Sequence, residues 1–561
     1  MTARDHLVDL LIVGSGAGGM VAALVGKSLG LDVLVIEKTG YFGGSTARSG
    51  GGVWVPNNYL LAQEGVTDSL ESAQLYMKHT VGERVPEKLQ QTYLTQTPRM
   101  IEWLRDNTCV QFQRMPGYSD YYPERPGGLS AGRSLEPVPF NGNKLGAELS
   151  FLRKTMAEAP GGMAITASEY QKIGMVMSTW EGKKTALRIG LRFLWDLLTR
   201  VRRLTMGQAL SARLRHAMQL ADIPLWLDTT FEDLIVDAQG CVIGITAQKE
   251  NRQLRILDRK GVILAGGGFA HNLEMRQKYL PQPTSTQWTV GSPGSTGDDI
   301  QAGIRIGADV DLMDDAWWGP SSRPPEEDAF FHVGERAYPG AIMINGLGQR
   351  FVNESAPYID VVNAMYRQHK PQASHIPVYF IFDQRYRDHY LFGLNFPMIP
   401  IPSRYYKNGY FKRAASLADL AHDLGLDGGD LLNTVERFNR FAREGKDLDF
   451  QRGDSAYENY YGDPNVKPNP SLAPLEHAPY YAVSMWPGDL GTKGGLKTDE
   501  HGRVLRTDGS IITGLFAVGN SMASVMGNSY PGAGATLGPA MTFGYLAAQC
   551  AANETDDHLK Y

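Results

Sequence analysis

The polar and apolar positions near the N-terminus follow a strand–turn–helix–strand pattern. Val8–Val13 is mostly apolar and predicts a buried strand; a helical stretch and a second strand, ending at Glu37, follow. Between the first strand and the helix, Gly14, Gly16 and Gly19 stand at GxGxxG spacing. These glycines allow a tight turn, approach of the backbone to a pyrophosphate and close helix–strand packing. Because an acid at the position of Glu37 can bind a ribose diol, the pattern predicts a dinucleotide site.

Later glycine-rich segments indicate that the dinucleotide is long. The loop Tyr41–Asn58 follows the first unit, and Gly261–Asn272 and Gly514–Ser524 each read as a strand that ends in glycines. Sites spread over the whole chain fit FAD better than NAD, and the last one requires a discontinuous FAD domain. We expect non-covalent FAD to contact Gly14, Ser15, Gly16, Ala17, Gly18, Gly19, Glu37, Lys38, Gly43, Gly44, Ser45, Thr46, Ser49, Gly50, Gly51, Gly52, Phe231, Ala265, Gly266, Gly267, Gly519, Asn520, Ala535, Thr536 and Leu537.

The composition excludes several other classes of protein. The chain has 561 residues, enough for about two to four domains, and its net charge of −5 argues against a nucleic-acid partner. Its 3 cysteines are isolated, so we expect no disulfide scaffold, no zinc or other metal site and no CxxCH haem site. A charged stretch leads into the first strand without a signal peptide, and no apolar run reaches the roughly 18 residues of a membrane span. These features predict a cytoplasmic protein.

Four segments resemble the family of FAD-dependent 3-ketosteroid dehydrogenases and fumarate reductases, and the 3-ketosteroid Δ1-dehydrogenases are the nearer branch. The segments are Pro116–Gly128, Arg350–Val361, Trp486–Ile511 and Gly519–Tyr545. The likeness covers nearly the whole chain apart from an insert at about 150–206. It implies an α/β fold, with a discontinuous Rossmann-like FAD-binding domain (1–316 and 490–561) and an inserted α+β catalytic domain (317–489).

The resemblance also implies an activity, the 1,2-dehydrogenation of a 3-ketosteroid A ring in steroid degradation, and a role for each of four residues. Tyr530 matches the tyrosine that hydrogen-bonds the C3 carbonyl oxygen, and Gly534 matches the glycine whose backbone N–H shares that task. Tyr358 matches the general base that takes a C2 proton while a hydride passes from C1 to flavin N5. Tyr121 matches the phenol that assists the base. Further candidates for the pocket wall are Tyr118, Tyr122, Tyr460 and Tyr461.

Elementary chemistry is consistent with these roles. The C2 protons are acidic only because the C3 carbonyl can become an enolate, so donors at that oxygen stabilise the transition state more than the ground state. The helical pattern after Gly534 would add the positive end of a helix. A neutral phenol with a pKa of about 10 is a poor base. Tyr358 therefore needs a hydrogen bond from Tyr121 that favours its charged form, and an alkaline optimum follows.

Other functions remain open from the residues alone. They are Δ4-dehydrogenation, fumarate reduction and, from a different class, a non-catalytic flavin carrier or sensor. Fumarate reduction needs cations for two carboxylates. The candidate cations are Arg323, Arg336, Arg350 and Arg367. We interpret them as ordinary surface pairs, with a structural role for Arg350. The expected partners are a 3-ketosteroid and an external electron acceptor, a quinone or another compound.

Within the insert, Lys183–Leu204 predicts an amphipathic helix. Its apolar positions recur at helical spacing, and basic residues outnumber the single acid Asp196. The apolar set is Leu187, Leu191, Leu194, Leu198 and Val201, with the aromatics Phe193 and Trp195, and the basic set is Lys183, Lys184, Arg188, Arg192, Arg200, Arg202 and Arg203. Such a helix is typical of one that lies on a membrane, here the inner face. The alternative is a helix packed on its own domain or on a second subunit.

Overall fold

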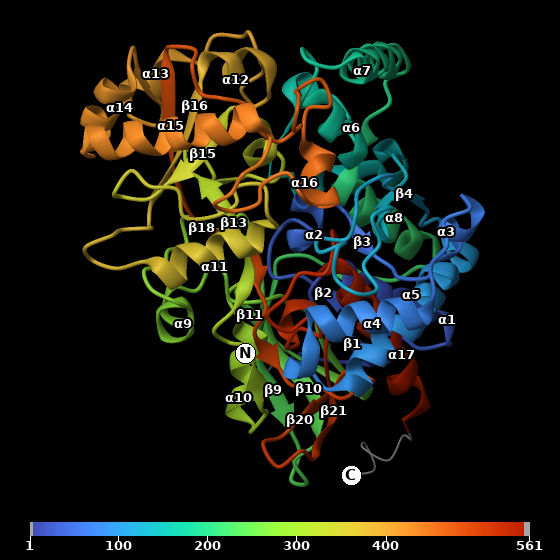
Figure 1. Cartoon of the computed structure of the whole chain (residues 1–561). Coiled ribbons are helices and arrows are strands. Elements are labelled where there is room, and N and C mark those ends of the chain that lie inside the picture. Colours follow the sequence, from blue (N-terminus) through green and yellow to red (C-terminus); the bar gives the residue numbers. More distant parts are fainter. Residues whose placement is uncertain (1–3, 157, 555–561) are drawn as a thin grey trace.

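The computed structural model describes residues 4–156 and 158–554, and it shows two large sheets with helices around them (Figure 1). The larger sheet has eight strands in the order β20-β21-β11-β1-β2-β8, with β10 and β9 continuing from β11. They are β1 (Arg4–Val13), β2 (Val33–Ile36), β8 (Leu225–Trp226), β9 (Thr229–Val236), β10 (Val242–Lys249), β11 (Arg252–Leu264), β20 (Arg503–Leu505) and β21 (Ile511–Ala517). The central strands from β21 to β8 are parallel, whereas β9, β10 and β20 pair antiparallel.

The N-terminal unit forms as the apolar pattern predicts. Leu10, Leu11 and Ile12 of β1 are fully buried. A parallel strand covered on both faces needs such a near-continuous apolar run. The sheet joins N-terminal strands to β20 and β21 from the far end of the chain, so the FAD-binding fold is discontinuous, as predicted.

Glycines bring the first and last large helices into close contact. Helix α1 (Ala17–Ser28) packs against α17 (Leu537–Asn553). A Cβ atom on Gly18 would lie 2.6 Å from the carbonyl oxygen of Ala540, and one on Gly544 would lie 2.3 Å from the carbonyl oxygen of Gly18. Because real Cβ atoms do not approach so closely, this contact requires glycine at both positions.

The second sheet has six antiparallel strands in the order β14-β13-β18-β16-β15, with β17 paired to β18. They are β13 (Ala316–Ser322), β14 (Phe330–Phe331), β15 (Ala341–Ile344), β16 (Val378–Asp383), β17 (Lys412–Ala414) and β18 (Tyr480–Thr492). Helices α14 (Leu417–Leu424) and α15 (Gly428–Glu444) cover one face and share a buried apolar cluster with Ile342 and Ile381. Helix α11 (Tyr358–Gln368) packs against β13. This is the inserted α+β unit that the sequence predicts.

Two paired strands connect the sheets. β13 and β18 pair from Ala316 opposite Thr492 to Ser321 opposite Trp486. The domain junctions expected at 316/317 and 489/490 therefore both fall inside this strand pair. The chain enters and leaves the second sheet through a hydrogen-bonded ribbon and not through two separate linkers.

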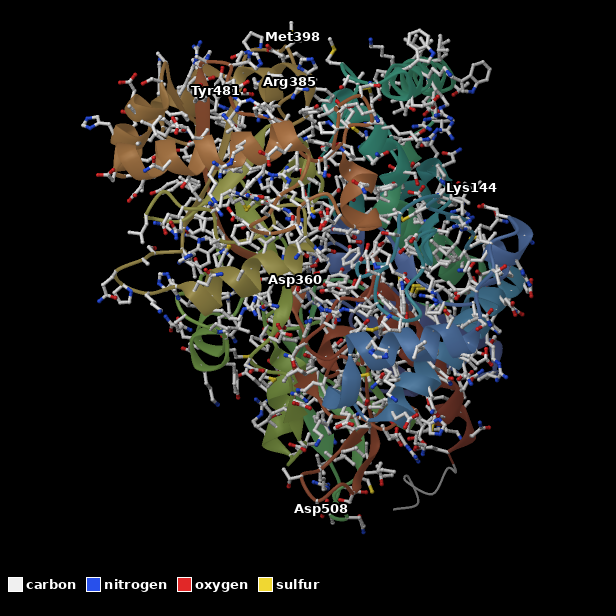
Figure 2. The ribbon with its side chains drawn as sticks, viewed as in Figure 1. Lys144, Asp360, Arg385, Met398, Tyr481 and Asp508 are labelled. Carbon is white, nitrogen blue, oxygen red and sulfur yellow. The ribbon has the colours of Figure 1, made fainter. Side chains whose placement is uncertain are left out.

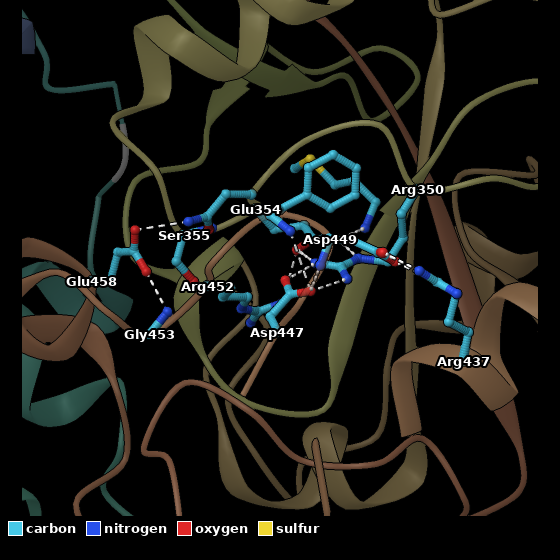
Figure 3. Close-up of polar contacts among 12 residues, drawn as sticks. Arg350, Glu354, Ser355, Arg437, Asp447, Asp449, Arg452, Gly453 and Glu458 are labelled. Carbon is cyan, nitrogen blue, oxygen red and sulfur yellow. Dashed lines mark hydrogen bonds and ion pairs between the residues drawn. The ribbon is translucent and has the colours of Figure 1, made fainter. Parts of the chain in front are cut away.

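A buried ion-pair cluster fixes the segment before α11 (Figure 3). Arg350 Nη2 lies 2.7 Å from Glu354 Oε2 and 2.8 Å from Asp447 Oδ2. Arg452 Nη1 lies 3.2 Å from the same Glu354 oxygen. The side chains of Glu354, Asp447 and Arg452 are fully buried, so each charge depends on its partners. Since Glu354 precedes Tyr358 by four residues, the cluster holds the chain where α11 begins.

Of the inner arginines expected at the surface, Arg336 is buried, so that interpretation is wrong for it. Arg350 belongs to the buried cluster, which confirms a structural position for it. Arg336 is 1% exposed, and its Nη1 donates to the carbonyl oxygens of Glu354 at 2.6 Å and Ala356 at 3.1 Å. Both guanidinium groups direct their donors to the protein itself, because burial leaves a charge no water to pair with.

The insert contains α6 (Ala167–Ile173) and α7 (Trp180–Thr199), and α7 projects from the body of the molecule (Figure 1). α7 begins before the expected Lys183 because the Thr179 side chain caps it, accepting from the N–H of Gly182. It ends before the expected Leu204 because Arg200 is left-handed, at φ 54°, and Arg203–Leu204 form β7, which pairs with β6 (Phe140–Asn141). Within residues 4–156 and 158–554, no helix is both long and apolar enough to cross a membrane.

The fold has further, smaller sheets and several other helices. A three-stranded sheet has the order β3-β5-β4. Its strands and the neighbouring helices are β3 (Val53–Trp54), β4 (Phe112–Arg114), β5 (Ser134–Pro137), α2 (Gly44–Arg48), α4 (Leu70–Thr80), α5 (Glu87–Asn107), α8 (Met206–Leu220), α10 (Asp298–Arg305) and α16 (Ala456–Tyr461).

Candidate active site

One cavity runs along the glycine turn between β1 and α1. Most of the residues expected at FAD line it: Gly14, Ser15, Gly16, Ala17, Gly18, Gly19, Glu37, Lys38, Gly44, Ser45, Thr46, Ser49, Phe231, Ala265, Gly266, Gly267, Gly519, Asn520, Thr536 and Leu537. Gly50, Gly51 and Gly52 line a second, adjoining cavity. Gly43 and Ala535 lie behind the walls: the Gly43 N–H donates to Ser15 Oγ at 3.1 Å, and the Ala535 N–H donates to the Gly532 carbonyl oxygen at 3.0 Å.

The geometry of this first cavity suits a dinucleotide. A Cβ atom on Gly16 would meet only Thr46 Oγ1, at 3.8 Å, so the backbone borders the cavity directly. Gly16 caps α1 without a side-chain hydrogen bond, which leaves the positive end of the helix open to an anion. Glu37 is held by Ser15 Oγ at 2.6 Å and by Thr39 Oγ1 at 2.9 Å. The carboxylate is thus fixed at the end of β2, where a ribose diol would lie.

The sequence interpretation missed one side of this cavity. The segment Gly291–Asp299 lines it through Ser292, Gly294, Ser295, Gly297, Asp298 and Asp299. Asp299 accepts hydrogen bonds from Ser521 Oγ at 2.6 Å and from the Gly266 N–H at 3.0 Å, and burial raises its pKa to about 6. A glycine- and serine-rich stretch before a helix was the signal that could have predicted this wall.

The second cavity shares Arg48, Ser49, Met156, Leu490, Thr536 and Leu537 with the first, so the two are continuous. Tyr121, Tyr358, Tyr530 and Gly534 all line it. Tyr358 is the first residue of α11, Tyr530 lies in the turn before α17, and Tyr121 follows β4. The structure therefore brings together residues that are up to about 400 positions apart in the chain.

The three phenols are in direct contact. Tyr121 Oη lies 2.7 Å from Tyr358 Oη. The ring of Tyr530 has its centroid 5.1 Å from that of Tyr121 and 5.2 Å from that of Tyr358, nearly perpendicular to the latter. Such edge-to-face pairs fix the angle of each ring. The hydroxyl groups of Tyr121 and Tyr358 therefore form a hydrogen bond beside the ring of Tyr530, and either one can be the donor.

Backbone contacts hold the turn that carries Tyr530. The Tyr121 N–H donates to the carbonyl oxygen of Pro531 at 2.9 Å, and Tyr76 Oη donates to the same oxygen at 2.6 Å. Gly534 has φ +93°, and a Cβ atom there would lie 2.4 Å from the backbone of Gly52. Only glycine fits this position, which places the Gly534 backbone at the cavity wall beside the Gly50–Gly52 loop.

Burial controls the acidity of the phenols. It raises the pKa of Tyr358 well above the usual value, and the neighbouring Tyr530 raises this pKa further, whereas the hydrogen bond from Tyr121 lowers it. Burial also raises the pKa of Tyr530 to about 12, against hydrogen bonds from Tyr358 and Thr536. The assistance expected from Tyr121 therefore has the predicted sign, but desolvation is the larger effect. Both phenols are protonated at neutral pH.

The rest of the wall is mainly aromatic and apolar. Tyr118, Tyr460 and Tyr461 line the cavity as expected, while Tyr122 donates to Asp360 Oδ1 at 3.1 Å. The sequence interpretation missed Phe330, Phe331, Val333, Leu391, Leu394 and Phe396, and the insert residues Met163, Ile165, Tyr170 and Ile173. No motif marks these residues, because only the packing of the insert against the inner unit brings them to one surface.

Comparison with known proteins places this geometry in a family. Residues 9–537 match the FAD binding domain family. The chain is 47% identical over 558 residues to the 3-oxosteroid 1-dehydrogenase of Mycobacterium tuberculosis, covering 98% of each chain. The structure of 3-ketosteroid delta1-dehydrogenase from Sterolibacterium denitrificans, in complex with 1,4-androstadiene-3,17-dione, has a TM-score of 0.92, with 40% identity over 98% of this chain and 99% of that chain. Since so little of the chain is uncovered, both comparisons extend through residues 150–206.

A more distant structure shows the shared fold alone. The 3-ketosteroid-delta4-(5alpha)-dehydrogenase from Rhodococcus jostii RHA1 has a TM-score of 0.68 with 21% identity, covering 99% of this chain and 98% of that chain. The family match and the 47% identical relative each cover nearly the whole length of the chain, and together they establish its family. The chain belongs to the 3-ketosteroid dehydrogenase family of FAD-dependent oxidoreductases.

Proposed function

We propose that this protein catalyses the 1,2-dehydrogenation of a 3-ketosteroid A ring. The observation that carries the proposal is the convergence of Tyr121, Tyr358, Tyr530 and Gly534 on an apolar cavity that is continuous with the glycine-lined cavity. The apolar wall suits a flat hydrophobic substrate, and the three phenols are gathered at one place in it. The names of the relatives support this substrate class and the Δ1 position.

The first cavity would hold FAD through the glycine turn and the other residues that line it. The open first turn of α1 would receive the pyrophosphate, and Glu37 would receive a ribose. FAD, when bound, accepts the hydride that leaves C1. The remaining chemistry is supplied by the side chains and backbone of the second cavity.

Tyr530 and Gly534 act on the C3 oxygen in this proposal. The Tyr530 O–H and the Gly534 N–H donate to that oxygen, and they bind it more tightly as it gains negative charge. Because the pKa of Tyr530 is raised to about 12, its phenol keeps the proton it donates over the whole physiological range. Burial makes both hydrogen bonds stronger than they would be in water.

Tyr358 acts as the base at C2. Its hydroxyl is 2.7 Å from that of Tyr121, whose O–H can donate to the phenolate form of Tyr358 before Tyr358 takes the C2 proton. Since burial raises the pKa of Tyr358, the base form is scarce at neutral pH. The rate should therefore rise with pH until Tyr530 itself begins to lose its proton.

The other candidate functions have less support. Arg336 and Arg350 donate to protein partners, Arg323 Nη1 donates to Gln287, and Arg367 Nε donates to the Asn363 carbonyl oxygen. In the described part of the chain these groups are not assembled around a site for two carboxylates. The contact among the three phenols argues against a carrier or sensor, since electron storage alone needs no base beside an oxyanion donor.

We further propose the domain limits 1–316 with 490–561 for FAD binding and 317–489 for the inner domain, which places the steroid between them. Both cavities share Leu490, near the end of β18, where the second sheet meets the first cavity. The electron acceptor would be an external compound such as a quinone.

We also propose that the protein is cytoplasmic and attaches to the inner face of the membrane through helix α7. The side chains of its apolar face are 57–81% exposed: Trp180, Leu187, Leu191, Leu194, Trp195, Leu197 and Leu198. Ile189 on the opposite face packs with Ile165 and Ile173. An apolar surface of this size on a projecting helix, flanked by basic residues such as Lys183 and Arg188, fits an anionic lipid surface. Residues next to α7, among them Arg203 and Leu204, line the second cavity, so a steroid could pass from the lipid to the site.

The cofactor site can be tested with Gly16→Val. Gly16 has an extended backbone that a side chain tolerates, and the added atoms would fill the space of the pyrophosphate. We expect wild-type protein to release FAD on heating and the variant to be folded but colourless, by absorbance at 450 nm and circular dichroism. Gly428→Val is the control, since a Cβ atom there meets open space at the start of α15. A yellow Gly16→Val protein, or release of FMN, would contradict the site.

The base can be tested with Tyr358→Phe. This change removes only the hydroxyl that faces Tyr121, so we expect FAD to remain bound while kcat with a 3-ketosteroid and a dye acceptor falls at least about 10²-fold. In the wild type, kcat should increase from neutral to alkaline pH. Tyr122→Phe is the matched control, because Tyr122 contacts Asp360 and lies outside the cavity wall. Retention of kcat by Tyr358→Phe would rule out this role.

The oxyanion role can be tested with Tyr530→Phe. Loss of one such donor costs about 10²–10³ in rate, and it should lower kcat more than it raises KM. With reduced flavin and no acceptor, wild-type protein should exchange the C2 hydrogens of a 3-ketosteroid with deuterium from the solvent. The variant should exchange them much more slowly, by mass spectrometry. Unchanged exchange together with lost turnover would show that Tyr530 only positions the substrate.

Membrane attachment can be tested by adding negative charge to the apolar face of α7. The double variant Leu194→Glu/Leu198→Glu should lower binding to vesicles of anionic phospholipid at least about 10-fold, since each leucine loses its transfer into the lipid. The control is Leu448→Glu, at a side chain that is 63% exposed on the inner unit. Sedimentation of the three proteins with vesicles at low salt measures binding. Equal binding of all three would mean that α7 meets protein and not lipid.

A further inference from the structure

A buried lysine lies behind the turn that carries Tyr530. Lys493 follows the last residue of β18, and its side chain is fully buried. Its Nζ donates to Asp315 Oδ2 at 3.1 Å and to the carbonyl oxygen of Ser529 at 3.0 Å. The same ammonium lies 4.9 Å from the centre of the Trp317 ring. Its surroundings are thus a carboxylate, a carbonyl oxygen and an aromatic face.

Stability alone is a weak reason for this lysine. Burial lowers the pKa of Lys493, and Asp315 and Asp360 oppose that effect. Figure 2 labels Asp360 near the centre of the molecule. A buried ion pair often stabilises a fold no better than apolar side chains of similar volume. A role for the charge in the site itself is therefore worth testing.

The contacts of Lys493 lead to Tyr530 by two paths. Ser529, whose carbonyl oxygen accepts from Lys493, is the residue directly before Tyr530. Trp317, under the ammonium, meets the ring of Tyr530 at a centroid distance of 4.9 Å and an angle of 70°. The backbone and the ring of Tyr530 are thus both supported by partners of one charged group.

The Asp315 carboxylate extends this support. Its Oδ2 also accepts from Asn528 Nδ2 at 3.0 Å, so the pair holds the turn at Asn528 as well as at Ser529. Trp317 Nε1 donates to Asn520 Oδ1 at 3.1 Å, and Asn520 lines the first cavity. The same arrangement therefore links the turn of Tyr530 to the wall of the dinucleotide cavity.

We propose that Lys493 is a positioning residue for Tyr530. Its ammonium group fixes the Asn528–Tyr530 turn through the Ser529 carbonyl oxygen and through Asp315, and it fixes the ring angle through Trp317. The phenol O–H is then aimed at the position of the C3 oxygen before substrate arrives. This inference rests on the proposed function only for the identity of the oxygen that Tyr530 meets.

The test compares Lys493→Met with the double variant Lys493→Met/Asp315→Asn in the holoenzyme. The single variant leaves a buried carboxylate without its cation and should lower the Tm. The double variant removes both charges, keeps the volume and should recover most of the Tm. In both variants kcat should fall about 10- to 100-fold with little change in KM, since a small misplacement of an aligned group has an effect of this size. Lys497→Met is the control, because Lys497 is 45% exposed and pairs with Asp309.

A second readout needs no turnover. With 3-fluorotyrosine placed at position 530, the ¹⁹F resonance should be single and sharp in the wild type and in Lys497→Met, and shifted or broadened in both Lys493 variants. An unchanged resonance in the double variant overturns the proposal, as does recovery of kcat together with the Tm. If wild-type protein fails to oxidise 3-ketosteroids, the proposed function fails, and the ¹⁹F comparison still decides whether Lys493 orders Tyr530.

Discussion

The contact between α1 and α17 is the constraint on which the site depends. The two helices can approach because Gly18 and Gly544 carry no Cβ atoms, and the approach sets the first turn of α1 beside the first turn of α17. The glycine turn and the start of α1 (Gly14–Gly19) therefore border one side of the continuous cavities, and Tyr530, Gly534 and Thr536 border the other. A bulkier residue at either crossing point would separate the cofactor turn from the turn of the proposed oxyanion donor, although neither turn would itself be altered.

The second requirement is the exclusion of water from the three phenols. Tyr121, Tyr358 and Tyr530 are all at most 4% exposed, and burial is the largest cause of the raised pKa of each. The same desolvation has opposite effects on the two proposed roles. It keeps Tyr530 protonated, which a donor needs, and it opposes ionisation of Tyr358, which a base needs. Contact between Tyr358 and Tyr121 offsets part of that cost.

The sequence predicts what depends on local pattern. The β1–α1–β2 unit is one continuous segment with glycines at fixed spacing, and the structure forms it as expected. The phenols could be assigned only through resemblance, because Tyr121, Tyr358 and Tyr530 are ordinary members of a set of 26 tyrosines until the fold brings them together. Other features arise from tertiary packing. The left-handed Arg200 shortens α7, and the Phe330–Val333 and Leu391–Phe396 segments become a pocket wall only when the insert covers them.

The paired strands β13 and β18 limit how the two halves of the protein can move. A single-chain linker can act as a free hinge, whereas a hydrogen-bonded ribbon resists twisting and opening. The ribbon ends at the cavities, since Leu490 borders both of them. We therefore expect exchange of substrate and product to proceed without wide separation of the halves. Substrate and product would instead enter and leave on the side of the cavity that the insert forms. The entrance to the site would then lie next to the exposed helix α7.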